Sequence, residues 1–288
     1  MMDFGNVLTA MVTPFDDQNE LDLNRTEALI EHLINNGTDS LVVGGTTGES
    51  PTLTKDEKLT LYKHVVKVVN GRIPVIAGTG SNNTKETIEF TQKVEETGVD
   101  AVLLVAPYYN KPNQEGLYQH FKAIAELTKL PAMLYNIPGR TSINMDVDTI
   151  VALSKVPNIV AVKESSQDLL AITDIIDQTD DDFKLYSGDD GFTLPIVSVG
   201  GDGIVSVSSH LYGNEMQDMI QSYRNGDVAR AAQLHQQLLP KMKAFFKAPS
   251  PVPVKTALNQ AGISVGSVRL PLVPLTSDEE QQLKADLQ

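Results

Sequence analysis

The chain has 288 residues, of which 41% are hydrophobic and 21% charged, and its formal net charge is −14. It contains no cysteine, which excludes thiol catalysis, disulfides and thiolate metal sites. An acidic surface repels phosphate backbones and anionic membranes, so neither nucleic acid nor a membrane is expected as a partner. The sequence shows neither a secretory signal nor an apolar run long enough to span a bilayer, and we expect a cytoplasmic protein.

Short apolar runs alternate with longer segments of helical period up to about residue 208. Most of the runs are continuously apolar, which is typical of parallel strands buried on both faces. The predicted strands are Asn6–Thr13, Ser40–Gly44, Pro74–Ala77, Ala101–Ala106, Ala132–Asn136, Ile159–Lys163, Phe183–Ser187 and Gly203–Val207. This alternation predicts a closed (β/α)8 barrel of the TIM type. An open doubly wound sheet is the alternative, but no GxGxxG motif follows the first strand.

Amphipathic segments between the runs predict helices. Leu23–Asn36 carries one apolar stripe and ends before Gly37, and Thr54 with Glu57 forms a capping-box pattern at the start of Lys55–Val69. Further helices are predicted over Lys85–Thr97, Leu211–Arg224, Val228–Phe246, Pro253–Gln260 and Ser277–Leu287. We expect a catalytic barrel over residues 1–224 and a C-terminal helical domain over residues 225–288.

Active sites of such barrels lie at the carboxyl ends of the strands, so the residues that end each predicted strand are the candidates. Lys163 ends the run NIVAVK. An amine shielded from water loses its charge more readily, and a neutral amine can attack a ketone to form a Schiff base. The alternative is a strand-end lysine that reaches solvent or pairs with Glu164 or Asp168, and position alone favours it.

Three further candidates end other predicted strands. Tyr135 could transfer protons, although a structural barrel tyrosine is the simpler interpretation. The turn that contains Thr46 and Thr47 offers backbone N–H groups and hydroxyls for a carboxylate or a phosphate, or is only a glycine-rich turn; it lacks the GK[ST] ending of a P-loop. Arg140 could hold a carboxylate through two hydrogen bonds and supply positive charge in this acidic chain, or could be an ordinary surface arginine.

The sequence predicts neither a metal site nor a cofactor site. The histidines show no HxH or HExxH spacing. All except His210 fall within predicted helices, where we expect solvated or hydrogen-bonded side chains.

The order of several motifs along the chain is more specific than any one of them. They are LTAMVTPF (8–15), GGTTGES (44–50), PYYNKP (107–112), YNIPGRT (135–141), VKES (162–165), SGDD (187–190), PVPVK (251–255) and RLPLVPL (269–275). Over nearly its whole length the chain resembles the dihydrodipicolinate synthase family.

The resemblance implies a lyase that condenses pyruvate with L-aspartate 4-semialdehyde, giving 4-hydroxy-tetrahydrodipicolinate on the route to diaminopimelate and lysine. It implies that Lys163 forms the Schiff base and that Tyr135 transfers protons. Thr46 and Tyr109 match the partners of its hydroxyl relay, and the family's counterpart of Tyr109 comes from a neighbouring subunit. The resemblance therefore implies a homo-oligomer, and a tetramer rather than a dimer.

The resemblance also implies substrate contacts. Thr47 and the backbone of Val205 match residues that contact the keto-acid, and Arg140 matches the residue that recognises the aldehyde's carboxylate. Gly188, within SGDD, is a further substrate-binding candidate. Two departures lie beside the site: residues 163–167 read KESSQ where many members have KEA, Thr or Ser, and Gly, and Gly139 stands where serine is common.

A regulatory departure concerns the allosteric site at which some members bind lysine. Lys55 and Lys58 stand where lysine-inhibited members carry histidines, and two cations would repel the ammonium groups of lysine. The other matching positions of that site are Ser50, Asn82, Glu86 and Tyr108. We therefore expect weak or absent inhibition by lysine.

Two other functions remain as alternatives. A sister enzyme on the same scaffold, such as N-acetylneuraminate lyase or a 2-keto-3-deoxy-sugar-acid aldolase, would share the lysine and the tyrosine. The paired threonines and Arg140 favour the synthase over these. A barrel that binds a keto-acid without turning it over is the alternative from another class, and the joint presence of Lys163, Tyr135 and Thr46 argues against it.

Overall fold

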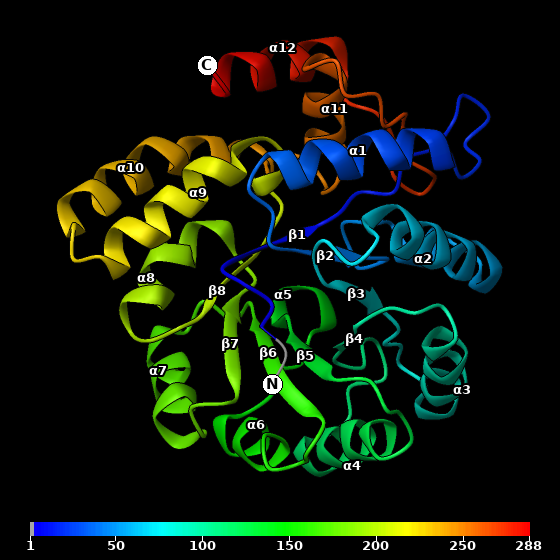
Figure 1. Ribbon diagram of the computed structural model, residues 1–288, viewed down its shortest axis with the longest axis vertical. Helices are drawn as coiled ribbons and strands as arrows, with labels where there is room; N and C mark the ends of the chain where they lie inside the picture. The colour runs from blue at the N-terminus through cyan, green and yellow to red at the C-terminus, as the bar shows by residue number, and fades with distance from the viewer. Residues whose placement is uncertain (1–2) are drawn as a thin grey trace.

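The computed structural model describes residues 3–288, and its centre is a closed barrel of parallel strands in sequential order (Figure 1). Each strand pairs with its neighbours in the chain, and the first pairs with the last. The strands are β1 Val7–Ala10, β2 Ser40–Val43, β3 Val75–Gly78, β4 Ala101–Val105, β5 Ala132–Asn136, β6 Ile159–Glu164, β7 Lys184–Ser187 and β8 Gly203–Ser206. The predicted (β/α)8 fold is confirmed.

Alternation along each strand divides the core into an inner and an outer layer. Inward side chains fill the barrel, among them Leu8, Val42, Met133, Ala161 and Val205. Outward side chains pack beneath the surrounding helices in a larger cluster. Because both faces are buried, the strands read as the continuous apolar runs seen in the sequence.

Helices surround the barrel in chain order (Figure 1). They are α1 Leu23–Asn35, α2 Lys55–Val69, α3 Thr84–Glu95, α4 Gln114–Ala125, α5 Pro138–Thr141, α6 Val147–Leu153, α7 Leu169–Gln178, α8 Thr193–Ser198 and α9 Ser209–Arg224, with short 3-10 turns at Ser50–Thr52 and Asp190–Phe192. Thr54 and Glu57 make the predicted capping box of α2. The side chain of Asn83 caps α3, so this helix starts at Thr84, one residue before the predicted start at Lys85.

The last part of the chain is helical, as predicted: α10 Val228–Ala244, α11 Val252–Gln260 and α12 Ser277–Asp286 (Figure 1). α10 packs along α9, and Leu234, Leu238 and Met242 share a buried cluster with Val7 and Ile204 of the barrel strands. The division into a catalytic barrel over residues 1–224 and a C-terminal helical domain over residues 225–288 stays a prediction. None of the described helices is long and apolar enough to cross a membrane.

Candidate active site

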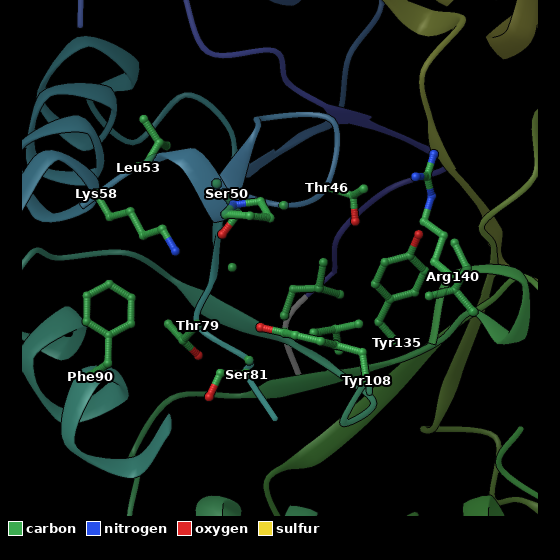
Figure 2. A pocket seen from close by; sticks show the side chains of 18 of the residues that line it. Thr46, Ser50, Leu53, Lys58, Thr79, Ser81, Phe90, Tyr108, Tyr135 and Arg140 are labelled. Atoms are coloured by element: carbon green, nitrogen blue, oxygen red, sulfur yellow. The ribbon is translucent and has the colours of Figure 1, made fainter. Parts of the chain in front are cut away.

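A cavity of about 380 Å³ opens at the carboxyl ends of β2 to β5 (Figure 2). It lies where the sites of barrel enzymes are found. Three predicted site residues line it, Thr46 after β2, Tyr135 on β5 and Arg140 on α5. The wall also includes Ser50, Lys55, Lys58, Glu86 and Tyr108, the positions expected from the allosteric site of the family.

Lys163 points into the barrel from β6, and its side chain is buried to 6% exposure. It lies opposite Tyr135 of β5 in the sheet register, and its Nζ is 4.3 Å from the centre of the Tyr135 ring. Within residues 3–288 no carboxylate forms an ion pair with this amine. The alternative of pairing with Glu164 or Asp168 is therefore wrong.

Glu164 follows Lys163 directly, and the alternation of the strand turns it to the other face. Its carboxylate accepts hydrogen bonds from Asn136 Nδ2 at 2.9 Å and from the Ser166 N–H at 2.7 Å. Burial raises the pKa of Glu164, and the Asn136 hydrogen bond partly offsets that rise. Glu164 thus joins the ends of β5 and β6 behind the site and leaves the Lys163 amine free.

The turn after β2 is held tightly by backbone hydrogen bonds. The Glu49 N–H donates to the Thr46 carbonyl at 3.0 Å, and the Ser50 N–H donates to the Gly45 carbonyl at 3.2 Å. Thr47 is buried, whereas Thr46 is half-buried and faces the cavity. The turn therefore presents Thr46 to the cavity, while the N–H groups of Glu49 and Ser50 are used within the turn itself.

Figure 2 shows the Tyr135 ring between Thr46 and Arg140. No hydrogen bond joins the Thr46 and Tyr135 hydroxyls within residues 3–288 of this single chain. Tyr109 is 89% exposed and does not line the cavity, and its φ of 75° is left-handed. The structure thus brings together Thr46, Tyr135 and Arg140, and it leaves Tyr109 on the surface.

Gly188 follows β7 and lies against the shaft of Lys163. A Cβ at this position would lie 2.9 Å from Lys163 Cε and 1.9 Å from Ser165 Oγ. Only glycine therefore leaves the lysine in its observed conformation. Val205, on β8, is buried in the inner layer beside these strands. Thr47, Lys163, Gly188 and Val205 lie outside the cavity wall, and the Tyr135 ring connects that wall to the lysine.

The expected allosteric positions gather at the other side of the same cavity. Figure 2 shows Lys58 reaching into it from α2, opposite Tyr108. Burial lowers the pKa of Lys58, and the charge of Lys55 lowers it further. Asn82 donates from Nδ2 to the Tyr108 carbonyl at 3.1 Å. Lys55, Lys58 and Glu86 thus line this side of the cavity together.

One buried cluster was not predicted from the sequence. Lys255 of α11 forms an ion pair with Glu49 of the turn after β2, with 2.9 Å between Nζ and Oε1. The other carboxylate oxygen accepts from the Arg269 N–H at 2.9 Å. The signal in the sequence is a single lysine within the apolar run PVPVKTAL, together with the RLPLVPL motif that contains Arg269.

The histidines lie in differing surroundings. His210 is fully buried, its Nε2 accepting from the Val12 N–H at 3.1 Å and its Nδ1 lying 2.8 Å from the Val207 carbonyl. Among the helical histidines, His120 bonds Thr84 Oγ1 through Nδ1 at 2.9 Å, and His64 and His235 are partly exposed, although each of the three has one buried ring nitrogen without a partner in the described chain. Within residues 3–288 no three His, Asp or Glu side chains could together hold a metal ion.

A closed parallel barrel with polar side chains gathered at the carboxyl ends of its strands defines the class of (β/α)8-barrel enzymes. The sequence pattern of the Dihydrodipicolinate synthetase family matches residues 3–288. The 4-hydroxy-tetrahydrodipicolinate synthase of Bacillus subtilis is 62% identical over 99% of both chains. This chain belongs to the dihydrodipicolinate synthase family.

Solved structures agree with that assignment. A dihydrodipicolinate synthase from Bacillus anthracis has a TM-score of 0.99 at 59% identity, covering 100% of this chain and 98% of the other. The enzyme from Cyanidioschyzon merolae, crystallised with lysine bound, has a TM-score of 0.97 at 47% identity, covering 99% and 97%. The likeness thus extends over the whole barrel and the C-terminal helices.

Proposed function

We propose that this chain condenses pyruvate with L-aspartate 4-semialdehyde to form 4-hydroxy-tetrahydrodipicolinate. The observation that carries the proposal is the buried Lys163 amine, which lies against the Tyr135 ring and is free of any ion pair in the described chain. The family and the whole-length likeness to 4-hydroxy-tetrahydrodipicolinate synthases support this reaction over a sugar-acid aldolase or a binding protein.

In the first half of the reaction, Lys163 Nζ attacks the ketone carbon of pyruvate, and loss of water gives an imine. The imine draws electrons from the adjacent methyl group, which loses a proton to give an enamine. Tyr135 is the group placed to carry protons in these steps, because its ring is in contact with the amine.

In the second half, the enamine carbon adds to the aldehyde carbon of the second substrate, and the new oxyanion takes up a proton. The amino group of that substrate then attacks the imine carbon, closes the ring and releases Lys163 as a free amine. Every atom of both substrates is retained except the water lost on imine formation, so no oxidant or cofactor is required.

Two carboxylates must be held in an acidic protein. The Thr47 hydroxyl and the N–H groups of the turn after β2 suit the pyruvate carboxylate, with the Val205 backbone and Gly188 beside the imine. Arg140 is on the cavity wall and suits the carboxylate of the aldehyde. The two substrates are thereby recognised by different elements of the barrel.

The proposed assembly is a homo-oligomer, and a tetramer rather than a dimer, in the cytoplasm. Tyr108 and Tyr109 are exposed aromatic residues on one loop, and Tyr109 adopts a left-handed conformation that is unfavourable for a large side chain. Such residues are enriched at protein interfaces. Tyr109 of one subunit would then complete the proton relay of its neighbour.

The test is reduction with borohydride in the presence of pyruvate, followed by peptide mapping. We expect a stable adduct on Lys163 and none in Lys163→Met. Lys184→Met, at the opposite end of the barrel, is the matched control. An adduct on another lysine contradicts the mechanism. Faster turnover of sialic acid or a keto-deoxy-sugar acid than condensation with aspartate semialdehyde contradicts the substrate assignment.

A further inference from the structure

The turn after β2 contains one residue in an unfavourable backbone conformation. Glu49 has φ 54° and ψ 35°, the left-handed region that residues with a Cβ rarely adopt. In this conformation its N–H reaches the Thr46 carbonyl and closes the turn that contains Thr46 and Thr47. A strained residue persists only when its surroundings hold it. The contacts of the Glu49 side chain therefore add to the backbone hydrogen bonds that hold the turn.

Those contacts come from the C-terminal part of the chain. Lys255 Nζ donates to Glu49 Oε1 and to the Thr13 carbonyl, each at 2.9 Å, and to the Ser267 carbonyl. All three Lys255 protons are thus used, and both partners of the ion pair are almost fully buried. Burial lowers the pKa of Lys255 to about 8, while the Glu49 carboxylate acts to raise it. Three donated hydrogen bonds require three N–H groups, so Lys255 is an ammonium in this cluster.

The same cluster reaches the turn by a second route. Lys255 holds the Thr13 carbonyl, and the Thr13 hydroxyl donates to the Gly48 carbonyl at 2.7 Å. Arg269 donates its N–H to Glu49 Oε2 at 2.9 Å, so both carboxylate oxygens are fixed. The turn is thus held through the side chain of Glu49 and through the backbone carbonyl of Gly48. None of these contacts touches the cavity wall directly.

A buried ion pair is weak support for stability, because apolar residues of similar size are often at least as stabilising. Removing one partner is damaging, since the other charge is left buried without compensation. Such a pair is of greater use for fixing one conformation. Here the conformation it fixes is the left-handed Glu49 and the turn that Glu49 closes.

We propose that Lys255 is a positioning residue for the keto-acid: through Glu49 it holds the threonine turn in the form that receives the pyruvate carboxylate. The inference rests on the proposed function, because the turn is assigned to pyruvate there. It gives the PVPVK motif a role in substrate binding from behind the site. Arg140 stands on a different element, so recognition of the aldehyde does not depend on this cluster.

Two variants test the proposal in the full-length protein. Lys255→Met removes the cation and leaves the buried Glu49 carboxylate without its ion-pair partner, which can impair folding. Lys255→Met with Glu49→Gln removes both charges and spares the protein a buried unpaired carboxylate. Lys184→Met breaks the Lys184–Asp202 ion pair at the amino ends of β7 and β8 and serves as the matched control. Melting temperature, KM for each substrate and the rate of borohydride trapping with pyruvate are measured for all.

We expect the double variant to melt at a higher temperature than Lys255→Met, yet to keep a pyruvate KM raised on the order of tenfold or more, because small displacements of positioning groups have large kinetic effects. The KM for the aldehyde is expected to stay near that of the wild type. A merely structural role would lower the active fraction and leave both KM values unchanged.

The outcomes separate the two proposals. A double variant with the wild-type pyruvate KM and trapping rate overturns the positioning role. An equal rise in both KM values overturns it as well, since the cluster would then act on the whole barrel. Failure of the wild type to be trapped with pyruvate overturns the proposed function instead.

Discussion

The glycine beside the proposed nucleophile offers a sharp test of the site, because one added methyl group meets the lysine directly. In Gly188→Ala the new Cβ would lie 2.9 Å from Lys163 Cε and 3.1 Å from Lys163 Cγ. Carbon atoms in contact are normally about 3.5 Å or more apart. The lysine shaft must therefore move by about 0.6 Å, the difference between about 3.5 Å and 2.9 Å.

The effect on folding should be small. Gly188 does not have a left-handed φ, so alanine fits its backbone. The nearest clash is with Ser165 Oγ, a buried hydroxyl without a partner in the described chain, which can rotate away. A compatible glycine-to-alanine change stabilises by about 0.4–1 kcal/mol through the unfolded state. An off-rotamer side chain costs about 0.5–1.5 kcal/mol, so the two nearly cancel.

The effect on chemistry should be large. A misplacement of about 1 Å can cost about 100-fold in rate, so a displacement of Lys163 Cε by a little more than half of that predicts a roughly tenfold to 100-fold slower reaction. The assay is the rate of borohydride trapping with pyruvate, measured beside the urea midpoint of unfolding. Gly139→Ala is the matched control, because its Cβ would meet nothing within 4 Å.

A wild-type trapping rate in Gly188→Ala would refute the reasoning, since Lys163 would then not depend on the space that glycine leaves. A slow trapping rate accompanied by an equal loss in Gly139→Ala would refute it too. The predicted signature is the combination of slow imine formation, an unchanged midpoint of unfolding and an active control.

Three further predictions concern other parts of the molecule. Arg140→Ala should leave trapping with pyruvate unchanged and raise the aldehyde KM about tenfold to 100-fold, the worth of a charge-assisted hydrogen bond; an unchanged aldehyde KM would exclude the assigned contact. Burial lowers the pKa of His120 and of His210 to about 4, so the unfolded chain takes up protons first as the pH falls below about 6.5. Between pH 7 and 5 each histidine should remove about 2 kcal/mol of the free energy of unfolding measured in urea titrations. His120→Leu should abolish about half of their combined loss, and a urea midpoint that does not change with pH would contradict the prediction. Lysine should inhibit weakly or not at all because of Lys55 and Lys58, and inhibition at low lysine concentration would overturn that expectation.

The strands could be located from the sequence because burial on both faces makes them apolar throughout. The same criterion placed the end of β1 too late. Residues 11–13 are buried but have left the strand, and the Val12 N–H bonds to His210 Nε2 instead of continuing a ladder. Apolar character reports burial, and only hydrogen bonding shows whether a buried segment is a strand.

The site was predictable to the extent that it lies at strand ends. Lys163 and Tyr135 are the next-to-last residues of the adjacent strands β6 and β5 and lie opposite each other in the sheet register, so the barrel topology brings them into contact. The support behind the turn was not predictable, because Glu49 and Lys255 are separated by 206 positions and no periodicity relates them. Tyr109 lies outside the site of its own chain, and a single sequence has no means of showing what covers it.

The distance along the chain between Glu49 and Lys255 has a consequence for synthesis. At about 5–20 residues per second, a ribosome needs roughly 10 to 40 s to extend the chain over the 206 positions that separate them. Throughout that interval the nascent barrel carries a Glu49 carboxylate whose cation has not been made. On the proposed role of Lys255, the turn after β2 takes its final form only once α11 has been synthesised.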